Sequence, residues 1–215
     1  NKGESGYMAI PSVASHNNWR SGLYVKASGV EFKMIPVAGL ESGFFLMAET
    51  ETTEALYKSV NGTSSTSQLP VDAVSYSEIS SFIEKLNNET KLTFSLPSAE
   101  QWKYAAKGGN KSQNYTYSGS NIPGDVAWYA ANCTSKQKVK TKAPNELGIY
   151  DMSGNVDEFT NTLHQNNYYG SFERYGGSYG SSSSGIGNTD CIYTNTDLQT
   201  SPYSGSGFRL ILTCK

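Results

Sequence analysis

The segment from Asp151 to Glu158, with the sequence DMSGNVDE, is the part of the chain richest in oxygen donors. Its carboxylates are those of Asp151, Asp157 and Glu158, and Gly154 permits a tight turn that directs backbone carbonyls inward. Calcium takes about six to eight oxygens from carboxylates, carbonyls and water. The segment therefore predicts a calcium loop, or else a polar turn whose side chains bond to their own backbone.

Thiol and imidazole groups are scarce. The three cysteines, Cys133, Cys191 and Cys214, are too few for a disulfide framework, and the odd number leaves at least one thiol unpaired. The two histidines, His16 and His164, do not have the spacing of a metal-binding pair. The spacing of Cys191 and His164 does not support a nucleophile pair. In addition, an isolated cysteine is usually a small core residue.

Residues 168–206 are rich in Tyr, Ser, Gly and Asn and carry few charges. Antibody combining sites use the same residue types, because tyrosine gives a large contact area with little loss of rotamer entropy. This composition predicts a ligand-binding face, the alternative being flexible loops whose tyrosines fill a small core. The aromatic candidates for the face are Tyr168, Tyr169, Tyr175, Tyr179, Tyr193 and Tyr203.

Composition narrows the class of protein. The chain has 215 residues, of which 37% are hydrophobic, 17% charged and 12% aromatic, with a net charge of −2. The aromatic content argues against intrinsic disorder, and the charge gives no basic footprint for nucleic acid. No apolar run is long enough to span a membrane. Many small polar residues and few charges favour an exported protein, from which a signal or lipoprotein leader has been removed ahead of Asn1.

The first half of the chain holds the clearest elements. Alternating apolar residues predict a hairpin of two strands at 31–37 and 43–47. Helical spacing predicts a helix over 52–60. We expect residues 1–30 to be an irregular segment and residues 31–215 to form one domain.

Two further helices are predicted from capping boxes. Ser75 is followed by Glu78, and Ser98 by Gln101, at the spacing with which each side chain bonds the other residue's backbone. Helices are expected over Ser75–Leu86 and Ser98–Lys107, and both are ended by polar or glycine pairs. After residue 110 we expect long loops with short strands at 148–152, 190–193 and 207–213. Such an arrangement predicts a loop-rich α+β domain.

Seven segments, in order, resemble the motifs of the formylglycine-generating enzymes, also called sulfatase-modifying factors. They are FKMIPVAG (32–39), ETETTEALY (49–57), PVDAVSY (70–76), LPSAEQWKYAAKGG (96–109), LGIYDMSGNVDEF (147–159), GGSY (176–179) and GFR (207–209). The match covers roughly residues 31–212. It implies a variant of the C-type lectin fold, with small antiparallel sheets, two main helices and much irregular loop.

The resemblance fails at the family's active site. Oxidase members carry two cysteines after the GGS motif, which bind copper as thiolates. The corresponding residues here are Ser181 and Ile186, neither of which can hold Cu(I). Some members form a disulfide from the positions of Cys191 and Ala106, which this chain cannot do. We therefore expect no copper and no catalytic residues.

The resemblance also implies a structural calcium site. Its ligands would be the side chains of Asp151 and Glu158 and the backbone carbonyls of Gly154 and Val156. Asp157 departs from the family, which has tryptophan at this position, and adds negative charge beside the site.

The leading hypothesis is a non-catalytic bacterial module, exported to the periplasm, the cell surface as a lipoprotein, or the medium. It would bind a protein segment or a glycan at the cell surface through its C-terminal loops, and nucleic acid is not an expected partner. Some proteins of the C-type lectin fold are diversified by retroelements just before a final GFR, and the Tyr-, Ser- and Asn-rich segment here has that composition. The alternatives are an enzyme of altered chemistry on the same fold and a structural domain of a surface assembly.

Overall fold

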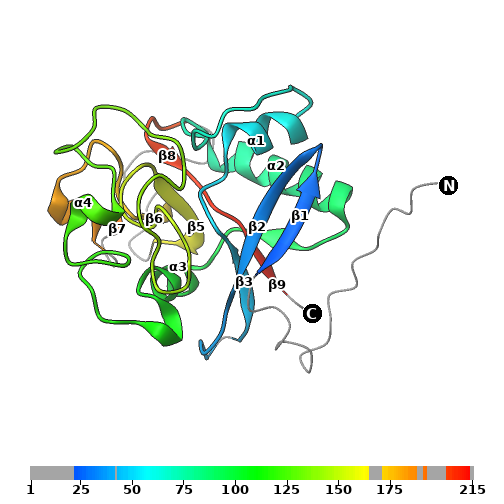
Figure 1. The fold of residues 1–215 in the computed structure, drawn as a ribbon. Coiled ribbons are helices and arrows are strands. Elements are labelled where there is room, and N and C mark those ends of the chain that lie inside the picture. The colour runs from blue at the N-terminus through cyan, green and yellow to red at the C-terminus, as the bar shows by residue number, and fades with distance from the viewer. Residues whose placement is uncertain (1–21, 42, 165–170, 188–190, 193–201, 214–215) are drawn as a thin grey trace.

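The computed structural model describes residues 22–213 except 42, 165–170, 188–190 and 193–201; of 191–192 it describes the backbone alone. Figure 1 shows two sheets, with helices α1 and α2 beside the first and α3 lying between the two. Within these residues, no helix combines the length and the apolar character needed to cross a membrane.

The first sheet has five strands in the order β1-β2-β3-β9-β4. They are β1 (Leu23–Ala27), β2 (Val30–Val37), β3 (Phe45–Ala48), β9 (Ile211–Thr213) and β4 (Phe94–Ser95). The predicted hairpin is confirmed, since β2 pairs antiparallel with β3. Strand β1 falls within the segment expected to be irregular and corrects that boundary. It joins β2 through Ser28 and Gly29, whose φ angles of 46° and 81° suit a two-residue hairpin turn.

The three predicted helices are present as α1 (Glu54–Val60), α2 (Tyr76–Thr90) and α3 (Ala99–Ala106), and both capping boxes form. A one-turn helix, α4 (Pro123–Val126), and two 3-10 turns, η2 (Gly109–Lys111) and η3 (Ser183–Ile186), were not predicted. Helix α2 runs past its expected end at Leu86. The Asn87 side chain does not cap it but bonds both backbone groups of Phe94 on β4, at 2.7 and 3.0 Å. Lys91, in the left-handed region, ends the helix instead.

The second sheet has the order β7-β6-β5-β8. Its strands are β5 (Asp157–Leu163), β6 (Phe172–Tyr175), β7 (Cys191–Ile192) and β8 (Ser206–Gly207). Strands β5 and β6 were not predicted, and the strand expected at 148–152 does not form. Strand β5 begins with two buried acidic residues, Asp157 and Glu158, which hide its alternation from a hydrophobicity pattern.

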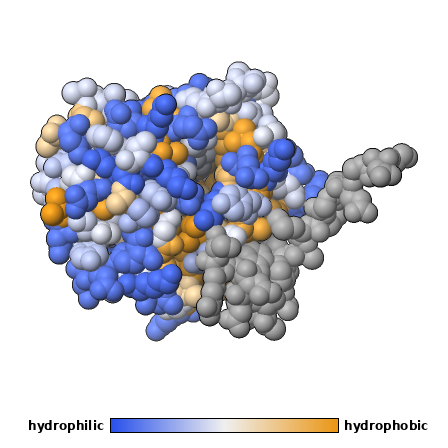
Figure 2. Space-filling model, viewed as in Figure 1, coloured by the Kyte–Doolittle hydropathy of each residue, from blue (hydrophilic) through white to orange (hydrophobic). Residues whose placement is uncertain are grey.

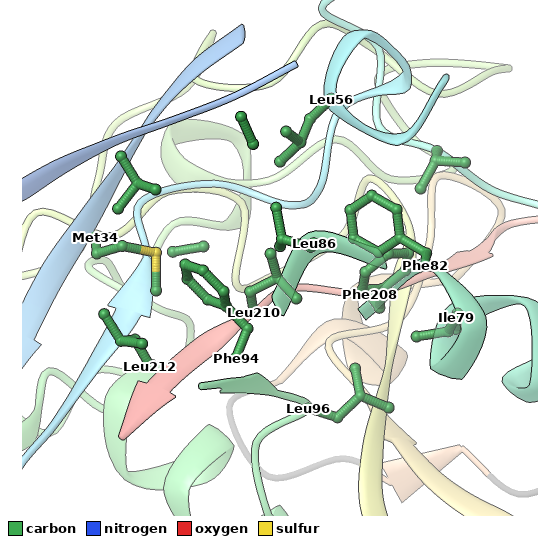
Figure 3. Packing of buried hydrophobic residues seen from close by; sticks show 14 of the residues in the cluster. Met34, Leu56, Ile79, Phe82, Leu86, Phe94, Leu96, Phe208, Leu210 and Leu212 are labelled. Carbon is green, nitrogen blue, oxygen red and sulfur yellow. The ribbon is translucent and has the colours of Figure 1, made fainter. Parts of the chain in front are cut away.

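The central strands of the first sheet are buried on both faces. On β2, Met34 faces the α1–α2 side and Ile35 faces the α3 side, as the period of two in a strand requires. Figure 3 shows the α1–α2 cluster, in which Phe82 and Phe208 meet edge to face at 5.4 Å. Trp102 of α3 is the centre of the opposite cluster and is fully buried. Helix α3 therefore joins the two sheets through one apolar layer.

Candidate functional site

The predicted calcium ligands lie on the turn before β5 and at the start of that strand, and both carboxylates among them have protein partners. The Asp151 carboxylate accepts a 2.7 Å hydrogen bond from the backbone N–H of Lys140. Glu158 faces Arg209, which donates from Nη2 at 2.5 Å and from Nε at 2.6 Å. The indole N–H of Trp102 donates to the same carboxylate at 2.6 Å. The partners of Glu158 lie more than 50 positions from it in sequence, and that of Asp151 lies 11 positions away.

Gly154 and Val156, whose carbonyls were the other predicted ligands, lie in the same buried turn. Gly154 has a φ of 77°, and a Cβ there would overlap the carbonyl oxygen of Trp128. The Val156 N–H donates to the Glu51 carboxylate at 3.0 Å, and the Asn155 amide donates to its other oxygen at 2.7 Å. Sequence reasoning missed Glu51, because nothing in its neighbourhood marks it as a partner of a turn more than 100 positions away.

The turn concentrates negative charge in the interior. Glu51, Asp151 and Glu158 are all at most 3% exposed, and Arg209 is the cation that faces Glu158. Burial raises the pKa of Glu51 well above its ordinary value, and the neighbouring carboxylates Asp151 and Glu158 raise it further. Burial likewise raises the pKa of Asp151 to about 6. A buried carboxylate without its own cation is costly to ionise.

The oxygen ligands at this turn are of the kind that calcium binds. Their existing hydrogen bonds restrict how an ion could bind there. Both oxygens of Glu158 accept bonds from Arg209, so an ion would have to share this carboxylate with the guanidinium. Among the residues described, no three His, Cys, Asp or Glu side chains are grouped as a metal site. The calcium site therefore stays a prediction.

The predicted tyrosine face is only partly within the described residues. Tyr168, Tyr169 and Tyr193 lie outside them. Tyr175 is 3% exposed and stacks on Trp102 at 5.4 Å, so it belongs to the core and its assignment to the face was wrong. It lies at the end of β6, where alternate side chains turn inward.

Tyr179 is half-buried and Tyr203 is exposed, and both lie near Gly205. Tyr203 is 43% exposed, and a side-chain atom of Tyr179 comes within 3.8 Å of where a Gly205 Cβ would stand. The Gly205 N–H donates to Asp72 at 3.2 Å, and Lys136 donates to the other oxygen of Asp72 at 2.7 Å. The turn at 203–206 is thus tied to the α1 side of the domain.

Beneath Tyr203 lies a buried cation. The guanidinium of Arg174 is 4.7 Å from the centre of the Tyr203 ring and has no exposed surface. It donates to Asp157 at 2.7 Å and to the hydroxyl of Ser206. Its Nε and Nη2 have no hydrogen-bond partner in the described part of the chain. Burial raises the pKa of Asp157 to about 6, although Arg174 acts in the opposite direction.

The two positions that correspond to the copper cysteines lie close to this face. The Ser181 hydroxyl accepts a bond from the Ser178 N–H at 3.0 Å and so closes a turn. Ile186 is fully buried against Val126 and Ala127. Neither side chain offers a soft ligand for a metal.

We predict that the protein becomes more stable as the pH is lowered from 7.5 to 5. The pKa of Asp151 is about 6 when folded, against an ordinary value of 3.8, so ionisation above pH 6 opposes folding. A pKa raised by about two units corresponds to a loss of roughly 3 kcal/mol in the free energy of unfolding. This free energy is fully regained below about pH 4. Asp151→Asn keeps an acceptor for Lys140 and should reduce the dependence, leaving the part that comes from the raised pKa values of Asp157 and Glu51. Urea unfolding at both pH values measures it, with exposed Asp125→Asn as the control; equal slopes in all three proteins would contradict the prediction.

The calcium prediction is tested by thermal unfolding. If Asp151 and Glu158 bind the ion, millimolar calcium should raise the Tm of chelator-stripped protein, because it binds only the folded turn. The rise should be larger at pH 7.5 than at pH 5, since the ion needs an ionised Asp151, and Asp151→Ala should abolish it. An unchanged Tm would contradict the calcium prediction and leave Arg209 as the cation that pairs with Glu158.

Known structures share this arrangement. Treponema denticola variable protein 1 superposes with a TM-score of 0.73 at 22% identity, over 88% of this chain and 98% of that one. CarF superposes with a TM-score of 0.71 at 21% identity, over 90% of this chain and 95% of that one. At these identities the likeness shows the fold alone.

A nearer relative in sequence matches over a shorter stretch. The chaperone protein LppX of Paenibacillus barcinonensis is 46% identical over an alignment of 90 residues, which covers 34% of this chain and 32% of LppX. The matched part is therefore about a third of that protein's length.

The family model of the sulfatase-modifying factor enzyme 1-like domain matches residues 15–214. This range holds all seven motifs and both sheets, and the superpositions confirm the expected α+β, C-type lectin-like fold. The chain therefore belongs to the family of the sulfatase-modifying factor enzyme 1-like domain.

Proposed function

We propose that this chain is an exported, non-catalytic binding module that uses the scaffold of the sulfatase-modifying factors. Its ligand is a protein segment or a glycan at the bacterial cell surface, and the contacts come from the loops at 168–206. The family and fold leave the activity open, because one scaffold can carry unrelated functions.

The observation that carries the proposal is the exposed Tyr203 ring over the buried Arg174. Buried polar groups are normally hydrogen-bonded, so a buried guanidinium with unpaired Nε and Nη2 calls for an explanation. A ligand oxygen that reaches past Tyr203 would satisfy these donors. Peptides and glycans both offer such oxygens, and tyrosine and arginine are typical of the energetically dominant positions in interfaces.

The chemistry at the family's copper positions also supports a non-catalytic role. Ser181 is used to close a turn, and Ile186 is part of the core. A serine and a buried isoleucine cannot reproduce two thiolates.

The names of the relatives also support a non-catalytic role. One structural neighbour is called a variable protein and the matched sequence relative a chaperone, and neither name describes sulfatase modification. Variation in a binding protein is most useful in loops outside the core, and exposed Tyr203 in the tyrosine-rich segment is such a position. Export is proposed from the composition, which is polar, aromatic and poor in charge.

We predict that the loop tyrosines dominate binding. A glycan and peptide array identifies a first ligand, and alanine is then placed at Tyr168, Tyr179, Tyr193 and Tyr203. At least one change should weaken binding about thirtyfold, because truncating a central tyrosine typically costs about 2 kcal/mol. Glu84→Ala, on the exposed face of α2, should have no effect. Four neutral tyrosine variants together with a weakened Glu84 variant would place the binding face elsewhere.

We also predict that the chain does not convert a sulfatase peptide. With Ser181 and Ile186 at the copper positions, a cysteine-containing peptide incubated with copper, oxygen and a reductant should keep its mass. A mass change to the aldehyde would support the alternative of an enzyme with altered chemistry. Restoring both cysteines in one variant is the matched comparison, and metal analysis of each protein shows whether copper is retained.

A further inference from the structure

A pocket lies on the first sheet, and none of its lining residues comes from the loops at 168–206. Its volume is about 380 Å³, and its walls come from the β1–β2 hairpin, residues 48–56 and the segment 138–141. Figure 2 shows hydrophobic surface on this side of the molecule, between the hydrophilic surface of the loops and that of the hairpin. A pocket of this volume is in the range that holds small molecules.

The inner part of the pocket is apolar. Ala48, Leu56 and Leu210 are buried side chains that line it, and half-buried Phe32 and Val139 extend the same surface. The accessible parts of Phe32 and Val139 favour a hydrocarbon or aromatic body, because covering them removes apolar surface from water.

The rim of the pocket carries positively charged groups, which attract an ionised carboxylic acid. The Lys140 ammonium lies 2.8 Å and the Lys33 ammonium 3.5 Å from the two oxygens of Glu49. Lys138 and Glu31 also line the pocket, so three lysines face two glutamates at its rim. The remaining lining carboxylate, that of Glu51, is buried and accepts bonds from Asn155 and Val156. Each ammonium also lies over an aromatic ring, Lys33 over Tyr24 at 5.7 Å and Lys140 over Tyr150 at 5.1 Å, which holds both at the rim.

A buried hydroxyl among the lining residues lacks a partner. Thr52 is 3% exposed, and its Oγ1 makes no hydrogen bond with any described residue. Its neighbour Glu51 does not supply one; the Glu51 oxygens accept bonds from Asn155 and Val156 instead. Leaving a buried hydroxyl unpaired lowers stability, so the position is explained if a ligand completes the bond.

We propose that this pocket binds a small amphipathic carboxylate. The apolar body lies on Phe32 and Val139, the carboxylate pairs with the ammonium groups of Lys33 and Lys140, and a polar atom of the ligand bonds Thr52. This site is separate from the face proposed for the macromolecular ligand.

The test uses three probes with one apolar body: 3-phenylpropionate, 3-phenylpropan-1-ol and 3-phenylpropylamine. Each is titrated into the full chain and followed by the backbone amide resonances of Thr52 and Val139. The carboxylate should bind about three- to fivefold more tightly than the alcohol, as expected for an exposed charge pair, and the amine should bind most weakly. Lys140→Gln should remove this preference, whereas Lys107→Gln, an exposed lysine at the end of α3, should not.

Thr52→Val supplies a second, independent measurement. It replaces the unpaired hydroxyl with a methyl group of similar shape, so the Tm should stay equal or rise while the affinity for 3-phenylpropionate falls. A purely structural threonine would give the reverse. Unperturbed pocket amides, equal affinity for the acid and the amine, or a Lys140→Gln variant that keeps the preference would each overturn the proposal.

Discussion

The buried ion pair of Glu158 and Arg209 is the contact on which the rest of this structure depends. It joins the start of β5 to the segment before β9, and the Trp102 indole on the same carboxylate adds α3. The remaining donors of Arg209 reach the carbonyls of Ala48 and Tyr150. Two sheets, one helix and one loop therefore meet at a single guanidinium. Removing one partner of such a pair leaves a buried charge, at a typical cost of about 3–5 kcal/mol.

The acidic turn beside this ion pair has a structural role. Glu51 binds the backbone and the amide of the turn, and Asp151 holds the segment at Lys140. The carboxylates thus position the loops on either side of the turn through specific hydrogen bonds. An additional cation at this turn would bind a carboxylate, that of Glu158, which already pairs with Arg209.

The surfaces proposed to bind ligands lie on either side of this interior. Lys136 donates to Glu54 on α1 and to Asp72, and Asp72 in turn holds the N–H of Gly205. The turn below Tyr203 is therefore anchored to the α1 side. The pocket on the first sheet shares the Lys140 segment with the acidic turn, so its rim depends on the Asp151 bond.

The sequence alone determined the local structure and the family. The capping boxes at Ser75 and Ser98 define their helices from neighbouring residues, because a cap needs only three positions of spacing. The ordered motifs indicated the fold, and the serine and isoleucine at the copper positions were visible without a structure. Only the tertiary structure decided that Tyr175 is core and that β5 is a strand. It also paired Glu51 with Val156, 105 positions away. Burial and long-range pairing are set when distant segments pack, and neither leaves a local pattern in the sequence.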